Sequence, residues 1–520
     1  MALFQVMMRT RSMRHNLVPP FIRIPVAGLL SAIAFNASSQ EAVANRSLSI
    51  YPSLAVTQTF TDNRLLSRDD RQAELITQIS PSLHFNRNSG RIRGHLDYSF
   101  NTYIYARDSA ANNFQNSLSA ALHVDAIENW AFLDATALIS QQSISAFGAQ
   151  SPDPALKTSN QSEVSSYSVA PYVRGAVPGI LNYQAAANYS ITRGGSFSAA
   201  NSSSTGVNAS LGSDRSLARL GWSANVSRQT INFDQGRRTE SDRFNGNLLF
   251  AVNPELRVSA KAGRESNNYQ FADHSSYSTW GYDINWRPNE RARFSFDSER
   301  RFFGNSHSIV VEYRTPKTVW NYLDSRNISA GSPTDSRVVV TTHDLLFAQF
   351  ASVAPDPIQR EILVNNYLLS NGINPGALVT GGFLTSAVSL QRRQALSLAL
   401  TGLRDTVILT AFKTENSALD SLAPRTDDLA AGGAIRQLGW GINVSHRLTP
   451  VSALNLSISQ LKSSASVGTQ ASNQRSITAT WTGRLNSRMN LSLAARHVIF
   501  DSSTVPYNES ALVAGLTFHF

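Results

Sequence analysis

Apolar and polar residues alternate one by one along most of the chain. In 280–287 one face is Trp, Tyr, Ile and Trp and the other is Gly, Asp, Asn and Arg; 293–297, 438–447 and 454–459 alternate in the same way. A period of two is that of a β-strand, whose successive side chains point to opposite faces. The candidate strands run roughly 9 to 16 residues, longer than the five or six typical of soluble proteins. Such lengths suit a tilted crossing of a bilayer, so the pattern predicts an all-β transmembrane barrel with its apolar face toward lipid.

Aromatic residues gather near one strand end, at Tyr98, Phe100, Tyr103 and Tyr105. Membrane proteins enrich aromatic side chains at the two bilayer interfaces. We therefore expect these four side chains to belong to an aromatic girdle on the outer surface.

The connections between candidate strands alternate between short and long. From the N-terminal side the short ones lie at 86–90, 126–129, 177–179, 213–216, 253–255 and 288–290, and the long ones at 61–70, 106–112, 145–161, 193–202, 232–240 and 268–275. From the C-terminal side, 502–507, 464–472 and 416–430 are long, and 486–487, 448–450 and 402–404 are short. Bacterial barrels have short periplasmic turns, long extracellular loops and an even number of strands. With a hairpin of Ser306–Arg314 and Thr318–Arg326, the count is about 22 antiparallel up-and-down strands, to within two, and both termini are periplasmic.

One segment, residues 328–384, departs from the strand pattern. Its apolar residues recur at spacings of three and four, the helical period, on both sides of Pro355-Asp356-Pro357. We expect a partly helical insert on the extracellular side or in the lumen. It could constrict the lumen, cover the mouth, or pack passively on neighbouring loops.

The first 44 residues are typical of a secretory signal peptide. Four arginines precede an apolar run at 24–35, which is too short to span a bilayer as a helix, and Ala42-Val43-Ala44 offers a cleavage site. Cleavage after Ser38 or Ser39, or an inner-membrane anchor, are the alternatives. The predicted organisation is a signal peptide at 1–44 and a barrel at 45–520, located in the outer membrane of a Gram-negative cell.

The final strand ends in a row of alternate apolar residues. Leu516, Phe518 and Phe520 close this row. Such a C-terminal strand resembles the signal that the barrel-assembly machinery reads during biogenesis, so we expect that machinery as a partner.

Composition excludes several kinds of chemistry. The chain has no cysteine, which removes disulfides, thiolate catalysis and Cys-based zinc sites. Its net charge of +10 becomes +7 when the four Arg and one Glu of residues 1–44 are removed. A basic exported protein more often meets lipopolysaccharide or an acidic polymer than nucleic acid. We therefore expect outer-membrane lipid and lipopolysaccharide, and no nucleic acid, as partners.

Candidate catalytic and metal-binding residues are sparse. Nine histidines follow residue 44, but there is no H-E-x-x-H or G-x-S-x-G motif. Asp273-His274 and His343-Asp344 are adjacent pairs that could form a hydrolytic site. Asp69-Asp70 and Asp427-Asp428 could bind a cation, although solvated loop ends explain them as well. We expect no enzyme activity, no cofactor and no metal.

Charged residues on the predicted inner rows suggest what the lumen attracts. The candidate lumen-lining cations are Arg257, Lys261, Arg287, Arg291, Arg293 and Arg447. A basic strip would attract an anionic solute. The alternative is a balanced network of Arg, Asp and Glu that braces a wide barrel.

Several strand and turn segments also resemble a known family. Thr59–Asn63, Ile79–Leu83, Arg301–Gly304, Phe383–Thr385 and Thr401–Val407 are similar to segments of the outer-membrane β-barrel proteins associated with the PEP-CTERM/exosortase system. The resemblance implies a role in the envelope near polysaccharide export, without transferring any functional residue.

These observations favour a porin-like channel that serves as a conduit for exopolysaccharide export. Its expected partners are an anionic exopolysaccharide or polysaccharide-export components. The alternative is a non-conducting structural barrel that binds polysaccharide or a partner protein through its loops. A TonB-dependent transporter shares the strand number, but strands here begin at about Ser49, where such proteins carry a plug domain.

Overall fold

The structure is a computed structural model. It describes residues 48–213, 219–329, 364, 382–419, 426–430 and 433–520. The predicted signal peptide, the candidate pair His343-Asp344 and, apart from Val364, the helical part of the predicted insert lie outside the described residues. Residues 1–46 cluster separately from residues 47–520, and only the second unit is described below.

The described residues of the second unit contain twenty-two strands. The first eleven are β1 (Leu48–Thr61), β2 (Glu74–Ser89), β3 (Ile92–Tyr105), β4 (Asn113–Ile127), β5 (Ala131–Ser143), β6 (Gln161–Val177), β7 (Leu181–Gly194), β8 (Ser202–Ser213), β9 (Leu220–Phe233), β10 (Thr239–Ala251) and β11 (Leu256–Asn267). The others are β12 (Ser275–Asn289), β13 (Ala292–Arg301), β14 (Gly304–Arg314), β15 (Thr318–Ser329), β16 (Ser389–Thr401), β17 (Asp405–Ala418), β18 (Ala434–Thr449), β19 (Ser452–Ala465), β20 (Ala471–Asn486), β21 (Met489–Ser502) and β22 (Tyr507–His519). The connections that the structure describes contain two short 3-10 helices, η2 (Ser109–Ala111) and η3 (Ser198–Ala200).

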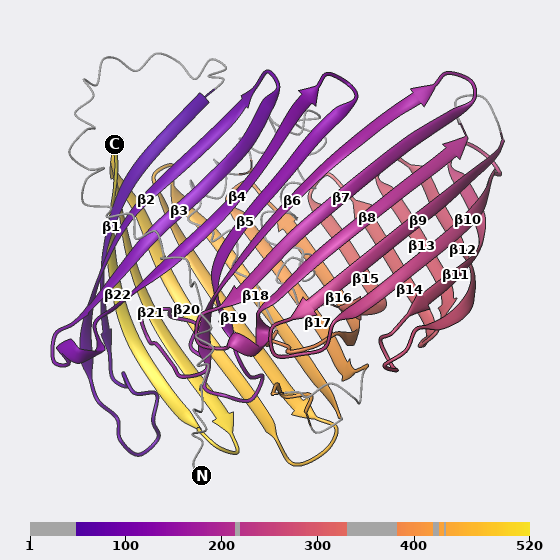
Figure 1. Cartoon of the computed structure of the whole chain (residues 1–520). Helices are drawn as coiled ribbons and strands as arrows, with labels where there is room; N and C mark the ends of the chain where they lie inside the picture. Colours follow the sequence, from indigo (N-terminus) through magenta and orange to yellow (C-terminus); the bar gives the residue numbers. More distant parts are fainter. Residues whose placement is uncertain (1–47, 214–218, 330–363, 365–381, 420–425, 431–432) are drawn as a thin grey trace, which may run out of the picture. The chain divides into compact units, whose positions relative to one another are not determined.

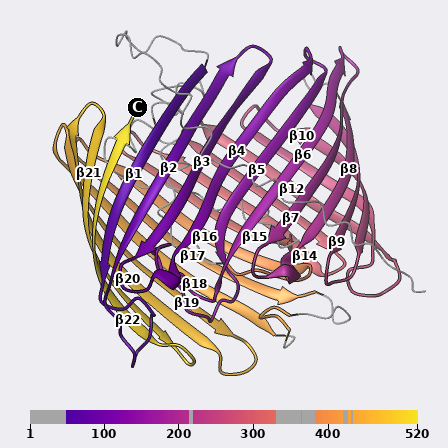
Figure 2. The same cartoon turned by 60° about the vertical axis from the view of Figure 1, so that its left-hand side comes forward.

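Each strand pairs antiparallel with its sequence neighbour, and β1 pairs with β22, as in Ser53↔His519. The sheet therefore closes into a barrel of tilted strands (Figure 1), and β1 lies beside the last strands of the chain (Figure 2). Closure leaves no unpaired edge, which is what a sheet needs in order to cross a bilayer. The predicted transmembrane antiparallel barrel and the count of 22 strands are confirmed.

The two ends of the barrel differ in their connections. The short-turn end carries connections such as Gly90-Arg91 and 402–404, and the long-loop end carries 62–73, 144–160 and the connection between β15 and β16. The predicted turn at 86–90 is too long, because strand pairing continues to Ser89↔Ile92. Among the described residues, no helix is long and apolar enough to cross a membrane.

The two faces of the sheet carry different side chains. On β12 the outward row has exposed Trp280, Tyr282 and Trp286, whereas the alternate row has Gly281 and Asp283. The same division follows the registers around the barrel, since residues paired across strands point to the same side. Exposed apolar rows therefore face outward, and largely polar rows face the interior.

The predicted aromatic girdle is wrong for two of its four residues. Tyr98 and Phe100 lie on the outward row of β3, but Tyr103 and Tyr105 lie on the inward row and are buried. An odd spacing along a strand moves a side chain to the opposite face, so four residues numbered 98, 100, 103 and 105 cannot share one face.

Candidate functional site

Residues 144–160, the inner loop, connect β5 to β6 and fold into the barrel. On one side Tyr105 Oη of β3 donates to Ala155 O at 2.6 Å, and Gln115 Nε2 of β4 donates to Pro154 O at 3.0 Å. On the other side Ser472 Oγ of β20 donates to Ala146 O at 2.9 Å. These wall residues all lie on inward rows. A loop that contacts the inner faces of β3, β4 and β20 together must lie inside the barrel.

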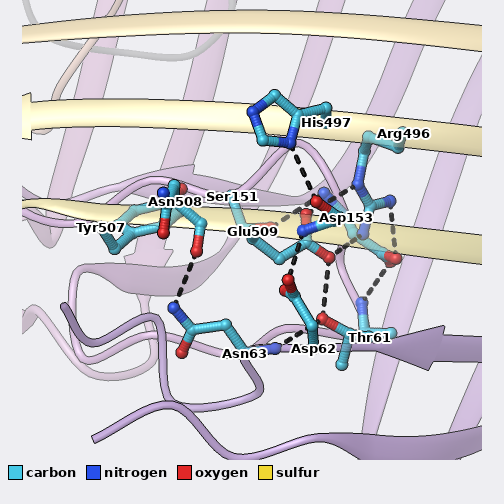
Figure 3. A network of polar contacts seen from close by, with 12 residues as sticks. Thr61, Asp62, Asn63, Ser151, Asp153, Arg496, His497, Tyr507, Asn508 and Glu509 are labelled. Carbon is cyan, nitrogen blue, oxygen red and sulfur yellow. Dashed lines mark hydrogen bonds and ion pairs between the residues drawn. The ribbon is translucent and has the colours of Figure 1, made fainter. Parts of the chain in front are cut away.

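A buried arginine ties the inner loop to the wall. Arg496 of β21 donates from Nη1 to Asp153 Oδ2 at 2.8 Å, and from Nε and Nη2 to the two carboxylate oxygens of Glu509 on β22 at 3.2 and 2.9 Å (Figure 3). The side chains of Arg496, Asp153 and Glu509 are 9%, 10% and 1% exposed. Thr61 Oγ1 of β1 donates to Glu509 at 2.9 Å. Bonds between ionised partners are the strong class of hydrogen bond, so this network fixes the loop where β22 meets β1.

Apolar side chains pack beside the arginine network. Ala155 and Leu156 of the inner loop join a buried cluster with Leu66 of the connection between β1 and β2. The other members are inward-facing wall residues: Ile76, Tyr103, Tyr105, Val498, Phe500 and Tyr507. Leu156 is 1% exposed. Burying a leucine side chain stabilises a fold by about 1.5–3 kcal/mol. Packing and ion pairing therefore act together to hold the loop against the wall.

A second segment, residues 382–388, also contacts the barrel interior and is called the crossing segment. Leu384 N donates to Ser143 O at 3.1 Å, and its side chain packs on Val164 of β6. Val388 packs on Ile231 and Phe233 at the end of β9. The crossing segment thus links the walls near β6 and β9 before entering β16.

Asp427 and Asp428, the aspartate clasp, join these two segments. Asp427 Oδ2 accepts from Ser386 N at 2.7 Å and Ser386 Oγ at 3.0 Å. Asp428 Oδ2 accepts from Ala146 N at 2.7 Å and Ser145 Oγ at 2.9 Å. Asp427 is buried, and both carboxylates accept hydrogen bonds from the inner loop or the crossing segment. The interpretation of this pair as solvated loop ends is therefore wrong.

Burial raises the pKa of the Asp428 carboxyl above its ordinary value, and the neighbouring Asp427 charge adds to that rise. The hydrogen bonds from Ala146 and Ser145 act in the opposite direction. The inner loop, the crossing segment and the clasp together narrow the barrel interior at the long-loop end.

Away from this constriction, much of the inner wall is neutral and hydrophilic. Its inward rows are rich in hydroxyls and amides, among them Ser53, Thr57, Ser80, Ser82, Asn188, Ser190, Asn208, Ser223, Asn225, Asn247, Asn443, Ser457, Ser459, Ser476, Thr478, Thr480 and Ser492. Several pair across strands, as Ser459 with Ser476 at 2.7 Å. The hydroxyl and amide groups of this wall can hydrogen-bond water or a polar solute.

The arc from β10 to β14 carries charged side chains of both signs. Lys261 pairs with Asp297 and lies 3.7 Å from Asp283, and Arg293 lies 3.8 Å from Glu312. Arg243 pairs with Glu299. Pairing of this kind agrees with the bracing network that the sequence left as an alternative to an anion-attracting strip.

The other predicted cations are placed near the short-turn end. Arg257 lies on the inward row of β11 beside Asn285, and its side chain is exposed, as are Arg287 and Arg291. Arg447 donates to Leu403 O in the turn between β16 and β17. The structure therefore groups Lys261 and Arg293 in the charged arc and separates Arg447 from them.

Of the two candidate catalytic pairs, Asp273-His274 lies within the described residues and His343-Asp344 lies outside them. His274 Nε2 lies 3.5 Å from Oε2 of Glu240 on β10, and the His274 side chain is exposed. In the part of the chain that the structure describes, no group of three or more His, Cys, Asp or Glu residues could hold a metal ion.

The predicted C-terminal signal lies at the closure of the barrel. Leu516 and Phe518 occupy the outward row of β22, opposite Val56 and Leu54 of β1. Phe520 is 75% exposed, and its backbone N donates to Pro52 O at 3.1 Å. Recognition by the assembly machinery stays a prediction.

The sequence analysis singled out the insert at 328–384 and did not predict that the inner loop contacts the barrel interior. The signal for the loop was its length, 17 residues between β5 and β6, on the predicted long-loop side. Nothing in the sequence joined Asp153 to Arg496, because these residues are 343 positions apart.

Comparison with solved structures finds outer-membrane barrels with low similarity. The FrpB iron transporter of Neisseria meningitidis (F5-1 variant) has 9% identity and a TM-score of 0.46, covering 90% of this chain and 82% of that one. The siderophore receptor PirA of Acinetobacter baumannii has 10% identity and a TM-score of 0.44, covering 92% and 81%. The outer membrane protein OpdK of Pseudomonas aeruginosa has 10% identity and a TM-score of 0.34, covering 91% and 99%. The sequence matches no protein-family model and no curated protein.

Proposed function

We propose that the protein is an outer-membrane channel whose long-loop end is narrowed by the inner loop, the crossing segment and the aspartate clasp. The observation that carries the proposal is the combination of an exposed apolar outer surface with an inner wall of hydroxyl and amide groups. A bilayer accepts the first face, and water or a polar solute fits the second.

The inner loop is the element of this channel that restricts the size of the solute. It is held by an ion pair, hydrogen bonds to the wall and a buried apolar cluster, so it is a built element of the interior. Barrels of 22 strands are wide, and a segment folded inward is a means of restricting passage through them. Solute size is then decided at the loop and solute polarity along the wall.

The proposed solute class is a saccharide chain, such as an exopolysaccharide. Its support is chemical, since sugar hydroxyls pair with the Ser, Thr and Asn groups of the wall, for example around Asn225 and Asn247. The resemblance to barrels of the PEP-CTERM/exosortase system points the same way. The paired charges of the β10–β14 arc do not favour an anionic solute over a neutral one.

A non-conducting barrel is the second candidate, and the inner loop is the observation that favours it. Three anchored segments that meet inside the barrel could seal it and leave its loops to hold polysaccharide or a partner protein.

Planar-bilayer conductance separates the two candidates. We would compare the wild type with a variant in which residues 146–158 are replaced by a short Gly-Ser linker. A channel predicts steady conductance for the wild type, larger conductance for the variant, and a decrease when a neutral oligosaccharide is added. Absence of conductance in both proteins, with folding verified by heat-modifiable mobility, would contradict the proposal.

A further inference from the structure

A cluster of cations lies on the outer surface of the barrel, above its apolar rows at the long-loop end. Lys413 of β17, Arg436 of β18, Lys462 of β19 and Arg475 of β20 form this basic collar. Strand registers place them together: Lys413 and Lys462 are both opposite Leu438 on the intervening strand. Neighbouring strands lie about 4.8 Å apart, so the two lysines are separated by roughly 10 Å at the backbone.

All four side chains lie on the outward rows. Lys413 shares its row with Leu409, and Lys462 shares its row with Ile458 and Leu456. Below Arg436 on β18 come Leu438 and Trp440, both exposed. Going from the long-loop end toward the short-turn end, this face therefore changes from cationic to apolar within a few residues. That order matches the boundary between lipid headgroups and acyl chains.

The local charge of the collar is positive. Glu415 lies 3.5 Å from Arg436, and Asp501 lies 2.7 Å from Arg475. Among the described residues, Lys413 and Lys462 have no acidic partner within ion-pair distance, so two of the four cations are uncompensated. Lys462 is exposed and Lys413 is half-buried. Ammonium groups of this kind attract phosphate groups, which they bind as compact point charges.

A hollow of about 650 Å³ lies at the collar. Its lining includes Arg436, Leu438, Lys462, Asn473 and Asp501. Two cations, an amide, a carboxylate and an apolar side chain thus share this concave surface, and Lys413 lies outside its lining. Asn473 also accepts a hydrogen bond from Gln460 at 2.8 Å. The Asn473 amide lies opposite Lys462 on the neighbouring strand, so it can bind a sugar hydroxyl while the lysine binds phosphate.

We infer that the basic collar is a binding site for the phosphorylated headgroup of a glycolipid in the outer leaflet, with Lys413 and Lys462 as its main phosphate ligands. The acyl chains then lie along the apolar rows that contain Ile458 and Trp440. The inference rests on the membrane position of the barrel and does not require that the barrel conducts.

The test is native mass spectrometry of the purified protein in a non-ionic detergent, with diphosphoryl lipid A as the probe. The test variant is the double charge reversal K413E/K462E. The matched control is R193E/R228E, which changes the net charge equally at two outward cations that already pair with Asp234 and Glu240. Heat-modifiable mobility verifies that each variant is folded.

We expect the wild type and the control to bind lipid A within about twofold of each other, and K413E/K462E to bind at least about tenfold more weakly. Excess inorganic phosphate should not displace the lipid, because the acyl chains contribute to binding. Equal loss in both variants, displacement by free phosphate, or equal binding of lipid A without its phosphates would each overturn the inference. Conductance of K413E/K462E should equal that of the wild type, so failure of the collar and failure of the channel are distinguishable.

Discussion

The ion pair between Asp153 and Arg496 offers the sharpest test of how the inner loop is held. The substitution Asp153→Asn keeps an oxygen for the Ala155 N–H, which Asp153 Oδ1 accepts at 2.9 Å. It replaces the oxygen that accepts from Arg496 with an amide donor. Arg496 retains both bonds to Glu509, so the wall stays paired while the loop loses its charged anchor.

The magnitude follows from the burial of this pair. A hydrogen bond to a charged group contributes about 1.5–3 kcal/mol, and both side chains here are nearly inaccessible to solvent. A loss of about 2 kcal/mol from the free energy of opening the loop corresponds to about thirtyfold faster amide exchange. The reporter is the Leu156 N–H, which bonds to Asp153 O at 3.0 Å inside the apolar cluster.

Hydrogen–deuterium exchange of the purified barrel measures this effect. The matched control is Asp234→Asn, which disrupts the exposed pair with Arg193 and should leave exchange in 144–160 within about twofold. Unchanged exchange at Leu156 in the Asp153 variant would refute the reasoning, because the loop would then be held by packing alone.

Three further predictions concern stability, measured by urea unfolding in detergent micelles. Arg496→Ala leaves Glu509 and Asp153 buried without their cation, so it should lower the free energy of unfolding by about 3–5 kcal/mol. The control Arg193→Ala, at an exposed ion pair, should lower it by less than about 1 kcal/mol. A small loss in both variants would contradict the buried network. Burial raises the pKa of Asp428 in the folded protein, so ionisation of this carboxyl opposes folding. The free energy of unfolding of the wild type should therefore fall relative to that of Asp428→Asn as the pH rises from the ordinary pKa of an aspartate to the raised pKa of Asp428. Parallel pH profiles for the two proteins would contradict this prediction. Leu248→Arg on an outward row should lower the free energy of unfolding by about 2–4 kcal/mol, whereas Asn247→Arg on the inward row should lower it little. Equal losses would contradict the assignment of outward rows to lipid and inward rows to the lumen.

The barrel itself was predictable because its rule is local. Alternation along Trp280–Arg287 needs no knowledge of the rest of the chain, since a strand places successive residues on opposite faces. Turn parity then extended this rule to the whole chain and gave the strand count. Strand ends were less predictable, because pairing to Ser89 depends on the partner strand β3.

The interior was not predictable, because its contacts join distant positions. The sequence places Asp428 in a loop, yet its carboxylate accepts a hydrogen bond from Ser145, which is 283 positions away. Tyr103 and Tyr105 read as girdle aromatics, yet they pack on Leu156 of the inner loop. Local pattern shows that a side chain is aromatic or acidic; only the closed barrel brings together the segments that bury it.

Cysteine accessibility along β10 tests most directly that the barrel holds a polar lumen in a membrane. The chain contains no cysteine, so single substitutions at Phe244, Asn245, Asn247 and Leu248 can be labelled without background. In liposomes, a membrane-impermeant maleimide should label positions 245 and 247 on the inward row and leave 244 and 248 on the outward row unlabelled. Equal labelling of both rows, or protection of both, would contradict the account.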